Sequence, residues 1–209
     1  RVDVPSLRPT NYARNVLHLA SSMTGLAALE LFASRTIPLA IATAFMLSGW
    51  TLEIARKKST RVNDACMKLF GRTAHPHEAH RINSATWYAT ALVVLAASGF
   101  VPACAVGLLA LGLGDPAAAI IGRRFGKVKL LHGRTLEGTL AFTLVGGLAG
   151  FAYLTLMHGQ YGVFVNATAA FVGTLAGALA ELSSKRLDDN LTIPLASFGT
   201  AAAVFYVLA

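Results

Sequence analysis

The chain has 209 residues, of which 55% are hydrophobic and only 13% are charged. The apolar content is higher and the charge lower than in soluble globular proteins, so the composition argues against a soluble domain. The formal net charge of +8 is typical of a nucleic-acid-binding protein, but no recognition module for nucleic acid accompanies the basic residues. We therefore expect a membrane protein without a nucleic-acid partner.

Seven apolar stretches are candidate membrane-spanning helices. They cover residues 17–34, 37–55, 85–100, 102–121, 138–157, 162–181 and 193–209. We expect an all-α, polytopic membrane helix bundle in which residues 1–209 form a single membrane-embedded domain. Small-residue pairs, Gly146 with Gly150 and Gly173 with Gly177, are expected to let helices pack closely.

The basic residues orient this bundle. If the N-terminus is cytosolic, the segments 1–16, 56–84, 122–137 and 182–192 face the cytosol and hold seventeen of the eighteen Lys and Arg residues. The exception is Arg35. The positive-inside rule therefore predicts a cytosolic N-terminus. Because the outer connections are brief, we expect the active site to face the cytosol, in a bacterial cytoplasmic membrane or an ER-type membrane.

A histidine-rich stretch, HPHEAH at 75–80, precedes the third apolar stretch. It does not have the HExxH spacing of zinc sites, because His80 is only three residues after His77, whereas HExxH separates its histidines by four. We expect this stretch to be a loop packed over the cytosolic face.

Carboxylates near the cytosolic ends of the helices are candidate functional groups, because a carboxylate at membrane depth is costly. They are Glu53, Asp115, Glu137, Glu181, Asp188 and Asp189. Asp115 is the deepest of them. Pro116 removes a helical hydrogen bond, and Gly112 and Gly114 weaken the helix, so we expect a broken helix that lines a polar cavity. An architectural ion pair is the alternative role for Asp115.

A basic, glycine-rich segment follows, GRRFGKVKLLHGRTLEGT, in which four glycines punctuate five basic residues. Backbone amides at glycine can approach an anion, and Arg and Lys neutralise it, so this pattern favours a polyphosphate site. It matches neither a P-loop nor a Rossmann fingerprint. An ordinary loop whose charge sets the topology is the alternative. Thr135 is expected to cap the next helix.

The segment ELSSKRLDDNLTIPL lies between the last two apolar stretches. Its adjacent carboxylates, Asp188 and Asp189, are suited to Mg²⁺, and Mg²⁺ together with basic residues binds nucleoside triphosphates. A solvated acidic pair is the alternative. We expect Mg²⁺ on Asp115 with one or more of Glu137, Asp188 and Asp189.

These motifs resemble the CTP-dependent lipid kinases, a family that includes dolichol kinase, phytol kinase and the eukaryotic CTP-dependent diacylglycerol kinase. The resemblance rests on GDPAAAIIGRRFGK, GRTLEGT and AELSSKRLDDNLTIPL, in the family's order and at similar spacing. It extends to ARNVLH and HEAHRINSATWY, so it covers most of the chain. The chain departs from the family pattern at Asn15 and Arg134, where the family commonly has lysine; Asn15 cannot replace a charge.

The resemblance implies an Mg²⁺-dependent enzyme that transfers the γ-phosphate of CTP to the hydroxyl of a membrane lipid, which would be a polyprenol, dolichol, phytol or diacylglycerol. Asp115 would be the catalytic acidic residue. The nucleotide would be held by Gly114, Gly122, Arg123, Gly126, Lys127, Lys129, Arg134, Thr135, Lys185 and Asn190, and the metal by Asp115, Glu137, Asp188 and Asp189. Asp115, Glu53 and Asp189 are alternatives for the group that accepts the lipid proton.

Two other functions are consistent with parts of the sequence. The GDPAAAIIGRRFGK and TLEG segments also look like those of phosphatidate cytidylyltransferase, which would transfer CMP and release pyrophosphate, but the chain lacks that family's GHGG segment. A small transporter or non-catalytic scaffold, with Asp115 as a coupling or packing group, belongs to a different class; the chain shows no internal repeat.

Overall fold

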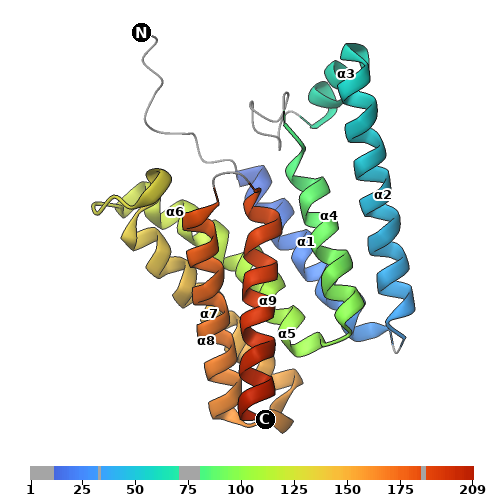
Figure 1. Cartoon of the computed structure of the whole chain (residues 1–209). Coiled ribbons are helices and arrows are strands. Elements are labelled where there is room, and N and C mark those ends of the chain that lie inside the picture. Colours follow the sequence, from blue (N-terminus) through green and yellow to red (C-terminus); the bar gives the residue numbers. More distant parts are fainter. Residues whose placement is uncertain (1–11, 33, 71–80, 185–186) are drawn as a thin grey trace.

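The computed structural model describes residues 12–32, 34–70, 81–184 and 187–209, and within these ranges the chain is built of helices (Figure 1). The α-helices are α1 (Tyr12–Leu31), α2 (Thr36–Lys58), α3 (Thr60–Phe70), α4 (Ser84–Ser98), α5 (Val101–Leu109), α6 (Asp115–Phe125), α7 (Leu136–Met157), α8 (Val163–Ser183) and α9 (Asp189–Leu208). A π-helical turn, η2 (Ala110–Gly114), and two 3-10 turns, η3 (Leu131–Gly133) and η4 (Gly159–Tyr161), complete them. The described residues contain no strand beyond an isolated bridge between Lys129 and Thr135, so the expected all-α class is confirmed.

Each predicted apolar stretch coincides with a helix. Five helices are long and apolar enough to cross a membrane: α2, the continuous helix Val101–Phe125, α7, α8 and α9. α4 has 15 residues, and α1 is not among the five. The expected number of seven spans therefore stays a prediction for these two helices.

α5 is the central helix. All of its residues from Pro102 to Leu109 are buried. The residues of α5 are small or apolar on every face, so neighbouring helices can pack on all sides. It packs against α1, α7, α8 and α9, while α4 packs between α2 and α9. In Figure 1, α2, α3 and α4 form one side of the molecule and α5 to α9 the other, with α1 between them.

The segment 56–84 was expected to face the cytosol, and no helix was assigned to it. The structure shows that part of it forms α3, which begins after Ser59 adopts an extended conformation (φ −139°, ψ 117°) that ends α2. α3 is amphipathic and too short to span a bilayer, so a search for apolar stretches does not detect it.

Glycines allow the helices to approach closely. A Cβ atom on Gly107 would lie 2.6 Å from the backbone oxygen of Pro194, so only glycine fits where α5 crosses α9. The small-residue pairs behave as predicted: Gly146 and Gly150 face α8, and Gly173 and Gly177 face α9. The expected close packing is therefore confirmed.

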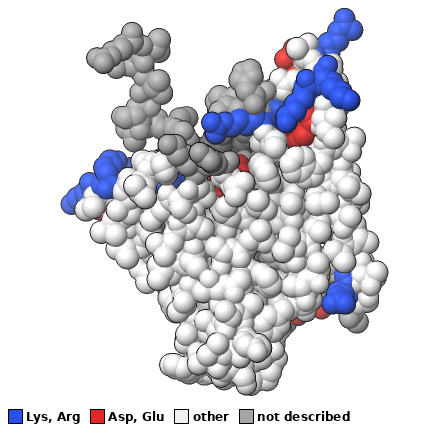
Figure 2. Space-filling model, viewed as in Figure 1, with Lys and Arg blue, Asp and Glu red and all other residues white. Residues whose placement is uncertain are grey.

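Charged side chains gather at one end of the bundle. Figure 2 shows Lys and Arg at the upper end of the visible face, above a wide band without charged residues. We call this end, where α2 and α6 end and α7 and α9 begin, the basic end. Arg35, which directly precedes α2, lies at the opposite end.

Candidate active site

Asp115 directly follows the π-helical turn of the central helix. This turn is closed by a hydrogen bond from the N–H of Asp115 to the carbonyl oxygen of Ala110, one residue farther than in an α-helix. Pro116 has no N–H with which to continue the regular pattern, and the wider turn accommodates it without ending the helix. The prediction of a broken helix is therefore wrong: the helix is continuous, and its irregularity is a π turn.

α1 and α7 enclose this turn. A Cβ atom on Gly112 would lie 2.7 Å from the Cβ of Ser22 on α1, and one on Gly114 would lie 3.0 Å from the ring of Phe142 on α7. Gly114 was expected to contact the nucleotide. In the structure it makes room for the Phe142 ring, which fixes the position of Asp115 beside it.

The chain between α6 and α7 folds around Thr135. The Thr135 hydroxyl oxygen accepts the backbone N–H of Gly138 at 3.2 Å, which caps α7 as predicted. A Cβ atom on Gly122 would lie 2.9 Å from this hydroxyl oxygen, and one on Gly126 would lie 2.5 Å from the Thr135 methyl carbon. The structure thus gives these two glycines a packing role that places Arg134, the neighbour of Thr135.

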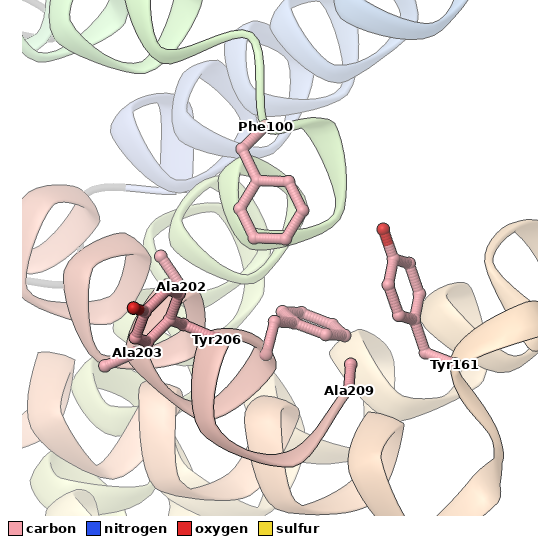
Figure 3. Close-up of a pocket in the computed structure, with 7 residues that line it drawn as sticks. Phe100, Tyr161, Ala202, Ala203, Tyr206 and Ala209 are labelled. Atoms are coloured by element: carbon pink, nitrogen blue, oxygen red, sulfur yellow. The ribbon is translucent and has the colours of Figure 1, made fainter.

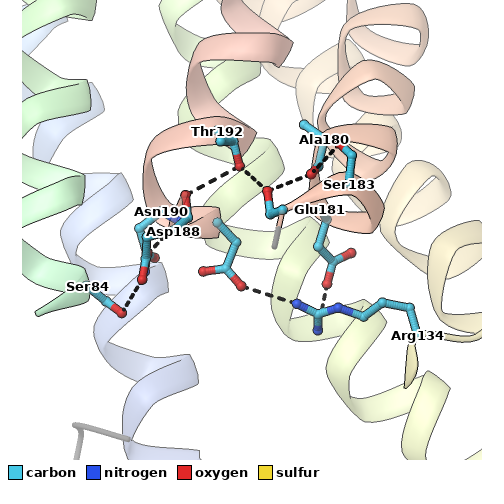
Figure 4. A network of polar contacts seen from close by, with 10 residues as sticks. Ser84, Arg134, Ala180, Glu181, Ser183, Asp188, Asn190 and Thr192 are labelled. Atoms are coloured by element: carbon cyan, nitrogen blue, oxygen red, sulfur yellow. Dashed lines mark hydrogen bonds and ion pairs between the residues drawn. The ribbon is translucent and has the colours of Figure 1, made fainter. Parts of the chain in front are cut away.

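Arg134 interacts with three carboxylates, two of them through ion pairs. Its Nη1 is 2.9 Å from Oε1 of Glu181, and its Nη2 is 3.2 Å from Oδ2 of Asp189 (Figure 4). Asp115 is a third negative charge that interacts electrostatically with the same guanidinium. The Glu181 side chain is 2% exposed and the Arg134 side chain 37% exposed. The arginine therefore connects the surface to a buried carboxylate.

The three neighbouring carboxylates keep the Arg134 side chain positively charged. Burial disfavours the charge, but Glu181, Asp189 and Asp115 outweigh that effect and raise the pKa of the Arg134 guanidinium. The planar guanidinium suits phosphate oxygens as well as carboxylate oxygens. The Arg134 guanidinium can therefore bind the oxygens of a polyphosphate in place of the Glu181 and Asp189 carboxylates.

Asp188 caps α9 and connects it to α4. Its Oδ1 accepts the backbone N–H of Asn190 at 3.0 Å and the Asn190 side-chain amide at 2.6 Å, and its Oδ2 accepts the Ser84 hydroxyl at 3.0 Å (Figure 4). Burial and the neighbouring Asp189 raise the pKa of Asp188, against the opposing effect of the hydrogen bonds from Asn190 and Ser84. Asn190 is buried, and its Oδ1 accepts no hydrogen bond from the described residues.

Several known proteins are similar to this chain, and three of them illustrate the relationship. Probable phytol kinase 2 of Oryza sativa is 33% identical over 153 residues, which are 68% of this chain and 49% of that protein. Phytol kinase of Synechocystis is 35% identical over 106 residues, 49% of this chain and 45% of that protein. Dolichol kinase of Saccharomyces cerevisiae is 34% identical over 91 residues, 43% of this chain and 17% of that protein. The chain belongs to the family of phytol and dolichol kinases.

The chain spans about half the length of these two phytol kinases and less of the dolichol kinase. No protein-family model matches it, and no solved structure matches it either.

In this member of the phytol and dolichol kinase family, other predicted site residues have separate surroundings. The Glu137 carboxylate accepts the backbone N–H groups of Lys127 at 3.0 Å and Val128 at 3.2 Å, so it holds the connection before α7. The side chains of Lys127 and Lys129 are exposed in that connection.

Arg123 and Lys185 complete the predicted cations. Arg123 interacts electrostatically with Asp115, and its Nε has no hydrogen-bond partner among the described residues. Arg123 therefore belongs with Arg134 at the Asp115 site. Lys185 and the HPHEAH stretch lie outside the described residues.

Glu53, an alternative proton acceptor, belongs to a different polar cluster. Nη1 of Arg56 is 2.7 Å from Oε1 of Glu53, and both side chains are 5% exposed. Glu53 also accepts the backbone N–H of Asn83 at 3.1 Å, and Nε of Arg56 donates to Asn63 at 3.0 Å. These contacts tie α2, α3 and the start of α4 together, which is an architectural role.

A separate pocket lies at the opposite end of the bundle (Figure 3). It measures about 670 Å³ and is lined by aromatic and alanine side chains, among them Phe100, Tyr161, Phe205 and Tyr206. No Lys, Arg, Asp or Glu is among its lining residues, so it offers no charge to a triphosphate. It lies near the end of α9, whereas Asp188 and Asp189 lie at the beginning.

The acidic residues fit a Mg²⁺ ion that arrives with a nucleotide. In the described ranges, no group of three or more His, Cys, Asp or Glu residues is arranged to hold a metal ion. Mg²⁺ commonly uses one or two carboxylates and takes its other oxygens from phosphates and water. Asp188 and Asp189 provide two adjacent carboxylates, and Asn190 Oδ1 is a buried oxygen without a donor among the described residues.

Two residues of this site were assigned no role from the sequence. Glu181 was noted as a carboxylate near a helix end, and its position as the one charged residue of α8 is the signal that pointed to it. Ser84 is 104 residues from Asp188, and no sequence pattern connects the two.

Proposed function

We propose that the protein is a CTP-dependent lipid kinase, which transfers the γ-phosphate of CTP to the hydroxyl of a membrane lipid in the presence of Mg²⁺. The observation that carries the proposal is the Arg134 cluster, in which a cation with a raised pKa lies among Glu181, Asp189 and Asp115 at the basic end of the bundle. Phosphoryl transfer depends on positioned charges more than on covalent chemistry. The family relationship to phytol and dolichol kinases supports the same reaction class.

Arg134 and Arg123 bind the triphosphate in this proposal. Phosphate oxygens replace Glu181 and Asp189 as partners of Arg134 when the nucleotide binds, since a guanidinium bonds both kinds of oxygen in the same geometry. Lys185 is a further predicted contact from the segment that connects α8 to α9.

Asp188 and Asp189 would hold the metal, with Asn190 Oδ1 as a neutral ligand. The ion would neutralise charge on the phosphate oxygens. Asp188 is oriented for this role by the hydrogen bonds that it accepts from Asn190 and Ser84.

Asp115 accepts the proton of the lipid hydroxyl. The hydroxyl oxygen forms a bond to the γ-phosphorus, and the bond from that phosphorus to the oxygen bridging the β-phosphate breaks. The electron pair stays with CDP, whose charge Arg134 neutralises. Asp115 suits this role because it lies on a helix long and apolar enough to cross the membrane, where a hydroxyl can reach it while the lipid tail stays in the bilayer.

The acceptor we propose is an isoprenoid alcohol of the phytol or polyprenol type, and the site faces the cytosol. The names of the relatives, phytol kinase and dolichol kinase, support isoprenoid alcohols over diacylglycerol. The excess of Lys and Arg at the basic end supports a cytosolic location.

The deciding experiment uses the purified protein in detergent with Mg²⁺ and CTP labelled in parallel at the α- or the γ-phosphate. Phytol, a polyprenol, dolichol and diacylglycerol are offered separately, and ATP is compared with CTP. We expect γ-label, and no α-label, in an isoprenoid product. Entry of α-label into lipid would instead indicate a cytidylyltransferase. Absence of both transfer and CTP binding would favour a transporter or scaffold.

A further inference from the structure

The connection between α6 and α7 exposes apolar and basic side chains together. Its exposed apolar residues are Phe125 (54%), Val128 (50%), Leu131 (64%) and Leu136 (40%). Arg124, Lys127 and Lys129 are exposed among them, and the Arg124 guanidinium carbon lies 5.4 Å from the centre of the Phe125 ring. Residues 122–136 include five basic and no acidic residues. We call residues 124–136 the basic hairpin.

Hydrogen bonds fix the backbone of the basic hairpin. The N–H of Leu130 donates to the carbonyl oxygen of Arg134 at 2.8 Å, and the N–H of Leu136 donates to that of Val128 at 3.0 Å. The Glu137 carboxylate accepts the N–H groups of Lys127 and Val128. Because these polar backbone groups are satisfied internally, the exposed apolar side chains are a stable feature of the fold.

The position of the hairpin indicates what covers these side chains. Figure 1 shows it projecting sideways from the bundle at the basic end, near the level where α9 begins. A segment that projects sideways where helices leave a bilayer meets lipid headgroups. Apolar side chains are unfavourable in water but stable at the boundary between headgroups and acyl chains. Clustered Lys and Arg at this depth attract anionic lipids.

We propose that the basic hairpin is a binding surface for anionic phospholipid. Phe125, Val128 and Leu131 enter the boundary between headgroups and acyl chains, and Lys127 and Lys129 pair with anionic headgroups. This inference goes beyond the proposed kinase activity and does not depend on it. Arg134 and Thr135 belong to the same hairpin, so its lipid contact also steadies the segment that carries Arg134.

The proposal gives Lys127 and Lys129 a partner other than the nucleotide expected from the sequence. Their side chains are exposed on a hairpin that also exposes apolar residues, whereas Arg134 lies against Glu181 and Asp189. A nucleotide site explains the two lysines but not the exposed Val128 and Leu131. An anionic lipid surface explains both.

The test uses the full chain in nanodiscs of phosphatidylcholine with or without phosphatidylglycerol. A fluorophore is attached at Val128→Cys in a Cys66→Ser background; Cys104 is buried and stays unlabelled. Lipids that carry a nitroxide near the headgroup quench a fluorophore in their layer. Asp64→Cys, an exposed position on α3, is the matched control.

We expect stronger quenching at position 128 than at position 64, and a further increase when phosphatidylglycerol is added. The double variant Lys127→Gln/Lys129→Gln should reduce that increase at least about threefold, since each cation near the surface contributes to anionic lipid binding. Equal quenching at the two positions, or quenching independent of phosphatidylglycerol and of the lysines, would overturn the proposal. So would a double variant that weakens CTP binding while its quenching is unchanged, because the lysines would then serve the nucleotide.

Discussion

Asp115 combines three properties at one residue: a charge on an apolar helix, a π turn before it and an electrostatic interaction with Arg134. We expect Asp115→Asn to lower the kinase rate at least about 100-fold, since an amide cannot accept the lipid proton. The side chain keeps its size, so the thermal unfolding temperature in detergent should change little. Asp64→Asn on α3 is the control and should retain activity. A folded Asp115→Asn variant with normal activity would remove Asp115 from the mechanism.

Variants of the Arg134–Glu181 ion pair can distinguish a role in stability from a role in catalysis. Arg134→Gln leaves the Glu181 carboxylate buried without this partner, and we expect it to destabilise the protein by about 2 kcal/mol, less than for a fully buried pair because the Arg134 side chain is 37% exposed. The double variant Arg134→Gln/Glu181→Gln should recover most of this stability because it removes both charges.

Activity should not recover in that double variant, since Arg134 would still be absent from the phosphates. Thermal unfolding and CTP turnover, measured on both variants, check the two halves of the prediction. Recovery of activity together with stability would show that Arg134 only neutralises Glu181.

Ser84 is a positioning residue, because it acts on the metal site through its hydrogen bond to Asp188. A hydrogen bond to a carboxylate contributes about 1.5–3 kcal/mol, so Ser84→Ala should raise the Mg²⁺ concentration for half-maximal activity roughly tenfold. Ser84→Thr keeps a hydroxyl and should restore the wild-type value. Ser98→Ala, at the far end of α4, is the control. An unchanged Mg²⁺ requirement in Ser84→Ala would contradict this role.

At the scale of elements, the central helix depends on close contact with α9. Gly107→Ala would bring a methyl group against the backbone oxygen of Pro194, and a backbone atom cannot turn aside as a side chain can. We expect a loss of about 2 kcal/mol in unfolding free energy from this overpacking. Gly199→Ala on α9 meets no atom within 4 Å and should be neutral or slightly stabilising. Equal effects of the two variants on thermal unfolding would show that the crossing is looser than described.

The elements themselves were predictable wherever an apolar stretch decides the structure. α5, α7, α8 and α9 follow from long runs of apolar residues, and the cap at Thr135 follows from its side chain. α3 was not predicted, because it is short and amphipathic. Pro116 correctly marked an irregular helix, but the sequence does not distinguish a break from a π turn, since that choice depends on packing around Gly112 and Gly114.

At the scale of the whole molecule, the site is assembled from distant segments. Asp189 is 55 residues from Arg134, and Asp188 is 104 residues from Ser84. The motifs identified most of these residues but not their partners, because helix packing determines which ends meet. Glu137 illustrates this point: its predicted metal role stays untested, and the structure shows it bonded to the backbone of the basic hairpin.

The orientation of the bundle determines which solution supplies the nucleotide, and two native cysteines make it measurable. Cys66 on α3 is half-buried near the basic end, whereas Cys104 on α5 is fully buried and should not react with the reagent. If the basic end is cytosolic, a membrane-impermeant thiol reagent should label Cys66 in inside-out vesicles and not in right-side-out vesicles. A cysteine at Gln160, in the connection between α7 and α8, should show the opposite pattern in a Cys66→Ser background. The reversed result for both positions would place the Arg134 cluster outside the cytosol, where CTP is scarce, and would count against a CTP-dependent kinase.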